Sequence, residues 1–164
     1  MSGRRAAQVG APLPGFALPD TSGGTIRLWD FKQRRPVLLA LPHAGDCPVC
    51  RAWLAALAAR RAELADLDAA VLLVLPEPAP RAREVQAALH LPFTPLADEE
   101  GALRGAYGQG DGVGLYIADR YLECLGAWRA PDASGLPALE EPLTLLLAAE
   151  QEDCGCGLPA WPEE

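Results

Sequence analysis

The sequence predicts an α/β fold, with a central mixed β-sheet flanked by helices and an irregular, cysteine-containing C-terminal tail. Short apolar runs that suit buried strands alternate with amphipathic segments that suit helices. The chain of 164 residues has the length of one domain, and its sequence shows no internal repeat. We therefore expect one domain over residues 1–152, followed by a tail over residues 153–164.

The first half of the chain predicts two short extended pieces, a buried strand and a long helix. Residues 12–16 contain two prolines and should be extended, and a turn at 20–24 leads into a short strand at 25–28. Residues 37–41 are all apolar, as in a central strand that is buried on both faces. Residues 50–66 are rich in Ala, Leu, Arg and Glu, with apolar residues on one face, which predicts a helix.

The second half of the chain continues the alternation and ends in a helix. It predicts a buried strand at 71–75, a helix at 81–89, an extended proline-containing piece at 91–96, a short helix ending at Tyr107, an antiparallel hairpin of 115–118 and 122–125, and a last helix at 142–151. Five glycines in residues 105–114 are not followed by the Lys-Ser/Thr of a phosphate loop. This stretch is predicted to be a mobile loop near the functional site.

Two cysteines one helical turn apart, in Cys47-Pro48-Val49-Cys50, follow the central strand at the start of the long helix. The free N–H groups and the dipole of a helix start favour an anion, so one of the two thiols should have a lowered pKa and react as a thiolate. Their spacing also allows a disulfide that closes and reopens. The motif therefore predicts redox chemistry; the alternatives are half of a zinc site or inert core cysteines.

Neighbouring polar residues suggest how these thiols would be tuned. His43 precedes Cys47 by four residues, where it could stabilise a thiolate or accept a proton, or be a solvated loop residue. Asp46 would oppose a thiolate unless it caps the helix, and we expect it to cap. Cys124 lies between leucines in a predicted strand and should be a small buried hydrophobe.

The tail contributes a second pair of cysteines, Cys154 and Cys156. They could act as resolving thiols that reduce an oxidised Cys47 or Cys50, within one chain or across a homodimer. Alternatively, the four cysteines together form a CxxC plus CxC zinc site, or the tail is merely a disordered end.

Composition narrows the remaining classes of function. Five cysteines is an odd number and a low density for a disulfide-stapled secreted scaffold. No apolar segment follows Arg4 and Arg5, so we expect no secretory signal and a cytoplasmic location. The net charge of −8 argues against nucleic acid or an anionic membrane as partner. We expect no cofactor.

Residues 9–151 resemble the thioredoxin fold, and more closely its alkyl hydroperoxide reductase/thiol-specific antioxidant branch, which contains the peroxiredoxins and their redoxin relatives. The resemblance is carried by residues 10–18, 24–28, 46–50 and 116–119. The peroxiredoxin pattern Thr-x-x-Cys implies that Cys50 attacks peroxide, with Cys47 in place of the threonine. The thioredoxin pattern implies that Cys47 attacks instead.

Two features depart from the peroxiredoxin pattern. The loop proline, Pro42, is one position from its expected place at His43. The arginine that precedes the late strand in that family has no match in residues 108–114, where Arg120 or Arg129 is the candidate substitute.

The resulting expectation is a thiol-disulfide oxidoreductase of peroxiredoxin-like type, which reduces peroxides or protein disulfides through Cys47 and Cys50. Its electrons would come from a dithiol reductant such as a thioredoxin-like protein. The alternatives are the zinc-binding thioredoxin-fold module and a non-catalytic redoxin domain used for protein interaction.

Overall fold

The core of the protein is a five-stranded mixed sheet with the order β5-β4-β3-β6-β7. The computed structural model describes residues 7–44 and 46–154. The strands are β3 (Val37–Leu41), β4 (Ala70–Leu75), β5 (Leu96–Ala97), β6 (Val113–Ala118) and β7 (Cys124–Ala130). The pairs β3–β4 and β4–β5 are parallel, whereas β3–β6 and β6–β7 are antiparallel. The predicted mixed sheet and its C-terminal hairpin are confirmed.

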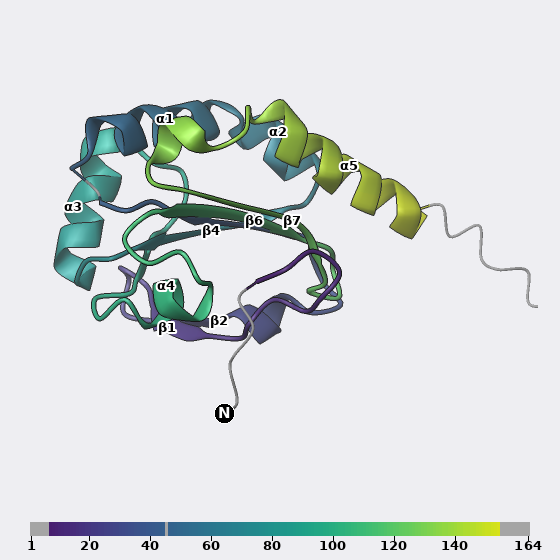
Figure 1. Ribbon diagram of the computed structural model, residues 1–164, viewed down its shortest axis with the longest axis horizontal. Coiled ribbons are helices and arrows are strands. Elements are labelled where there is room, and N and C mark those ends of the chain that lie inside the picture. Colours follow the sequence, from purple (N-terminus) through teal and green to yellow (C-terminus); the bar gives the residue numbers. More distant parts are fainter. Residues whose placement is uncertain (1–6, 45, 155–164) are drawn as a thin grey trace, which may run out of the picture.

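One face of the sheet is covered by helices (Figure 1). They are α1 (Pro48–Ala59), α2 (Arg61–Asp66), α3 (Ala79–Leu89) and α5 (Glu140–Cys154). Leu38 and Ala40 of β3 pack in the same apolar cluster as residues of these helices. The single helix predicted over 50–66 is two helices, because Arg60 leaves helical geometry, with φ −96° and ψ 12°. The last helix is longer than predicted at both ends and includes Cys154.

The opposite face is covered by a small hairpin and short helices rather than by long helices. The hairpin pairs β1 (Ala17–Pro19) with β2 (Thr25–Arg27), and the 3-10 helix η1 (Leu28–Phe31) and α4 (Ala102–Ala106) complete the layer. Alternate residues of β3, namely Val37, Leu39 and Leu41, pack into this side of the core. Because side chains alternate along a strand, β3 is buried on both faces, as its continuous apolar run predicts.

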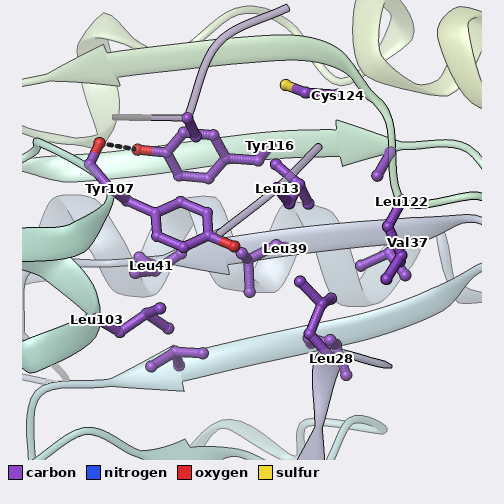
Figure 2. Close-up of a cluster of buried hydrophobic side chains, with 14 of the residues drawn as sticks. Leu13, Leu28, Val37, Leu39, Leu41, Leu103, Tyr107, Tyr116, Leu122 and Cys124 are labelled. Carbon is purple, nitrogen blue, oxygen red and sulfur yellow. Dashed lines mark hydrogen bonds between the residues drawn. The ribbon is translucent and has the colours of Figure 1, made fainter. Parts of the chain in front are cut away.

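Two tyrosines lie in the apolar cluster between the sheet and the β1–β2 layer (Figure 2). Tyr107 and Tyr116 are fully buried, with their ring centroids 4.9 Å apart in an edge-to-face arrangement. The Tyr107 hydroxyl donates to the carbonyl of Pro14 at 2.7 Å, and the Tyr116 hydroxyl donates to Oε1 of Gln109 at 3.0 Å. Burial raises the pKa of both phenols, that of Tyr116 to about 12.

These buried phenols predict a loss of stability in alkali. An unfolded tyrosine ionises with a pKa of about 10, whereas folded Tyr116 keeps its proton to about pH 12, so the unfolded state binds fewer protons in this window. The free energy of unfolding should therefore fall by up to about 1.4 kcal/mol per pH unit for each such tyrosine as pH rises above 10. Urea denaturation across this range should show a shallower fall for Tyr116→Phe than for the wild type. An identical slope in the variant would contradict the prediction.

Candidate active site

Helix α1 begins directly after the loop that follows β3, and this places the two cysteines at its start. Cys47 is the N-cap residue, and its carbonyl accepts the backbone N–H of Arg51 at 2.9 Å. Pro48 occupies the first helical turn, where its missing N–H costs nothing and its fixed φ suits the helix. The prediction that Asp46 caps the helix is wrong, because the proline sets the cap one residue later. Asp46 is exposed instead.

Cys50 lies one turn further into α1 and is fully buried. It packs against Val113 at the start of β6 and against Ala133, while Cys47 is only partly buried at the edge of the same cluster. The Nδ1 atom of His43 lies 3.2 Å from Sγ of Cys50. The ligand atoms of His43, Cys47 and Cys50 all lie within 4.8 Å of one another. The structure thus brings together the three site residues that the sequence placed on one short segment.

The surroundings of Cys50 favour its protonated form. Burial raises the pKa of the Cys50 thiol, hydrogen bonds from the backbone N–H groups of His43 and Ala44 act against this, and Cys47 raises the pKa further. The lowered pKa expected at a helix start therefore does not apply to Cys50. A neutral, buried thiol needs a base beside it to react as a thiolate, and His43 is in contact with its sulfur.

A buried arginine that sequence reasoning missed supports this corner of the fold. Arg104 of α4 is only 7% exposed, and its guanidinium donates to the carbonyl of Pro42 and, at 2.8 Å, to that of Gly112. Pro42 precedes His43, and Gly112 precedes Val113, so this side chain joins the two segments that flank Cys50. Burial lowers the pKa of Arg104, while the charges of Asp98, and after it of Cys50, act in the opposite direction.

The arginines predicted as substitutes lie elsewhere. Arg129 donates to the carbonyls of Tyr107, at 2.8 Å, and of Ala7, with its guanidinium over the ring of Tyr116. Arg120 lies in the turn between β6 and β7, beyond the end of β6 that is farther from Val113. Arg104 lies in α4, four residues before the stretch 108–114 in which the family pattern places an arginine.

The glycine-rich stretch of residues 105–114 is a loop only in part, and its predicted mobility stays a prediction. It comprises the end of α4, a turn and the start of β6. A Cβ atom at Gly112 would collide with the carbonyl oxygen of Ala130, and one at Gly114 would collide with Oε1 of Gln109 and with the ring of Tyr116. These glycines are therefore required by close packing beside the site.

A pocket of about 310 Å³ lies on the His43 side of the site, and neither Cys47 nor Cys50 lines it. His43 and Arg104 line it together with the acidic residues Glu99, Glu100 and Asp111. A larger cavity of about 680 Å³ is lined instead by α2, β2, the start of β4 and residues 92–96. The smaller pocket gives a ligand access to the His43 side of the site.

The other cysteines lie apart from this cluster or outside the described residues. Cys124 is 1% exposed in the core, with its Sγ donating to the carbonyl of Gly126 at 3.3 Å, which confirms it as a buried hydrophobe (Figure 2). Cys154 is the last residue of α5, and its side chain is not among those described. Cys156 lies outside the described residues, so the resolving and metal-binding roles of this pair stay predictions.

Comparison with known proteins identifies the family. A family model described as the AhpC/TSA family matches residues 9–121, which is more than half of the chain. The chain belongs to the AhpC/TSA family. This confirms the resemblance drawn from the sequence and places this AhpC/TSA protein in the thioredoxin superfamily. Membership of the family supports a thiol-based redox function.

Solved structures confirm the thioredoxin-like fold. Peroxidoxin BcpB from Mycobacterium tuberculosis is 18% identical, with a TM-score of 0.76 over 87% of this chain and 97% of its own. A candidate thiol:disulfide interchange protein DsbE from Chlorobium tepidum is 24% identical, with a TM-score of 0.74 over 88% and 99%. The reduced 2-Cys peroxiredoxin of Plasmodium vivax is 18% identical, with a TM-score of 0.74 over 90% and 84%. No curated protein matches the chain.

None of the helices in the described part of this AhpC/TSA protein has the combined length and apolar character that spanning a bilayer would demand.

Proposed function

We propose that this AhpC/TSA protein is a thiol-disulfide oxidoreductase in which Cys47 attacks the substrate disulfide and Cys50 resolves the intermediate. One observation carries the proposal: Cys50 is fully buried against Nδ1 of His43, whereas Cys47 is the thiol that a substrate can reach. Cys47 is only partly buried, and the helix dipole favours negative charge at the start of α1.

The reaction then runs in two exchanges. The thiolate of Cys47 attacks one substrate sulfur, the substrate S–S bond breaks, and the other sulfur leaves as a thiolate that takes up a proton. His43 next accepts the proton of Cys50, whose sulfur attacks Cys47 and releases the second substrate thiol. The enzyme is left with a Cys47–Cys50 disulfide, which an external dithiol, such as a thioredoxin-like protein, reduces.

Trapping the intermediate tests this order. Cys50→Ser should accumulate a mixed disulfide with oxidised glutathione at Cys47, because the resolving sulfur is gone, whereas Cys47→Ser should form none. Mass spectrometry of the intact protein and its peptides, in buffer with a metal chelator, measures both. Cys124→Ser is the control and should exchange at the wild-type rate, since this thiol is buried away from the site. A mixed disulfide at Cys50, or normal turnover by Cys47→Ser, would refute the assignment.

Peroxide reduction at Cys50 is the second candidate, favoured by the N–H groups of His43 and Ala44 that face its sulfur and by the nearby charge of Arg104. Here a Cys50 thiolate would attack a peroxide oxygen, giving a sulfenic acid and an alcohol or water. Cys47 would then displace water to form the same disulfide. Hydrogen peroxide treatment of Cys47→Ser would trap the sulfenic acid at Cys50, and its absence would leave disulfide exchange as the activity.

A further inference from the structure

We propose that the reduced protein binds one zinc ion through the sulfurs of Cys47 and Cys50 and the imidazole of His43. Two thiolates and one imidazole are a donor set that zinc prefers, and their ligand atoms all lie within 4.8 Å of one another. This site differs from the four-cysteine alternative drawn from the sequence, because it takes its third ligand from the loop after β3 and needs neither tail cysteine.

The geometry requires little rearrangement. Zinc lies about 2.3 Å from sulfur and about 2.0–2.1 Å from nitrogen, so the edges of a tetrahedral site are about 3.6–3.8 Å long. The distance from Nδ1 of His43 to Sγ of Cys50 is 3.2 Å, and the longest separation within the triad is no more than 4.8 Å. Shifts of about 1 Å or less would therefore complete three corners of the tetrahedron. Cys47, which is only partly buried, is free to make most of that adjustment.

The charge of the two thiolates also favours a divalent cation. Cys50 is fully buried, and an unpaired thiolate at such a position is costly. A divalent cation bound by two thiolates leaves no net charge in the site, since the two thiol protons depart as the two S–Zn bonds form. Arg104 donates to the carbonyl of Pro42 and so holds the backbone next to His43.

A pocket borders one of the three proposed ligands. His43 lines the pocket of about 310 Å³, whose wall carries Glu99, Glu100 and Asp111. The three carboxylates outweigh the single positive charge of Arg104, which also lines the pocket, so the pocket as a whole would attract a cation. A water molecule that enters from this pocket would be the fourth ligand. Three protein ligands and one exchangeable position are the arrangement of reactive, rather than purely structural, zinc sites.

Zinc and a disulfide cannot occupy these sulfurs together. If the proposed exchange activity holds, a substrate disulfide would oxidise the zinc-bound form: both S–Zn bonds break, the Cys47–Cys50 bond forms, two substrate thiols form with uptake of two protons, and Zn²⁺ is released. This release rests on the proposed function, whereas the zinc site does not.

Anaerobic titration of the reduced full-length protein with Co²⁺, followed by displacement with Zn²⁺, tests the site. Wild-type protein should bind one equivalent, with a thiolate-to-cobalt charge-transfer band and the visible spectrum of a tetrahedral site. His43→Ala should weaken binding more than tenfold, and Cys50→Ser should abolish the two-thiolate spectrum. His90→Ala is the matched control, because His90 is the other histidine of the chain and lies at the end of α3. It should bind as the wild type does.

Two outcomes would overturn the proposal. One is unchanged affinity in His43→Ala, and the other is loss of the spectrum in a Cys154→Ser/Cys156→Ser double variant, which would favour the four-cysteine site. Thermal unfolding of each metal-free variant establishes that a loss of binding is not a loss of fold. Because the exchange test uses chelated buffer, failure of the zinc site leaves the result on disulfide exchange intact.

Discussion

Replacing Arg104 by methionine should lower the free energy of unfolding by about 3 kcal/mol. The side chain is 7% exposed and donates to the carbonyls of Pro42 and Gly112. Hydrogen bonds from a charged donor contribute about 1.5–3 kcal/mol each, and the variant leaves both acceptors without this donor, partly offset by the apolar packing of methionine. The carboxylate of Asp98, which faces Arg104, also loses its cation.

Urea denaturation of the wild type and of Arg104→Met measures this loss. The control is Arg27→Met, at an exposed position of β2, which should change the free energy of unfolding by less than about 0.5 kcal/mol. The rate of disulfide exchange should fall as well, because the Pro42 carbonyl that Arg104 holds lies next to His43. Equal stability of the two variants would mean that the contacts of Arg104 contribute nothing to the fold.

A loss of stability of similar size is expected when a leucine at the centre of the sheet is replaced by alanine. Leu39 is fully buried on β3, and Figure 2 shows it beside Tyr107. Leu39→Ala removes apolar contacts and leaves a cavity, for which the expected cost is about 2–5 kcal/mol. Leu147→Ala is the matched control, because Leu147 on α5 is 44% exposed and alanine suits a helix at least as well. Comparable unfolding midpoints for the two variants would contradict the assignment of Leu39 to the core.

Local chemistry explains which parts of the site were predictable. The all-apolar run of β3 and the cysteines at the start of α1 are adjacent in sequence, so hydrophobicity and spacing alone predict a strand followed by a thiol-bearing helix start. The proximity of His43 to Cys50 follows from the same short segment. Asp46 is a residue type that favours the cap position, but Pro48 determines that the helix begins one residue later.

Local sequence patterns do not predict contacts between segments that are far apart along the chain. Arg104 reaches the carbonyl of Pro42 across 62 residues of sequence, and no local pattern marks that pairing. A sequence shows the conformational freedom of Gly112 and Gly114 but not the neighbouring groups, Ala130 and Gln109, that leave no room for a Cβ atom at these positions.

Because Cys124 lies far from Cys47 and Cys50, its thiol can report the opening of the protein core. Cys124 pairs with Ala118 at one end of β6, and Val113, which packs against Cys50, lies at the other end, about 17 Å away along the strand. A thiol reagent can modify Cys47 in the native fold, but it meets Cys124 only when the core opens, at a rate that tracks the open population if reclosing is fast. Alkylation followed by peptide mass spectrometry therefore measures two rates in one sample: the modification of Cys47 in the native fold, and the modification of Cys124 after the core opens. A variant that impairs chemistry alone would alter labelling at the site, whereas one that weakens the fold would accelerate labelling at Cys124.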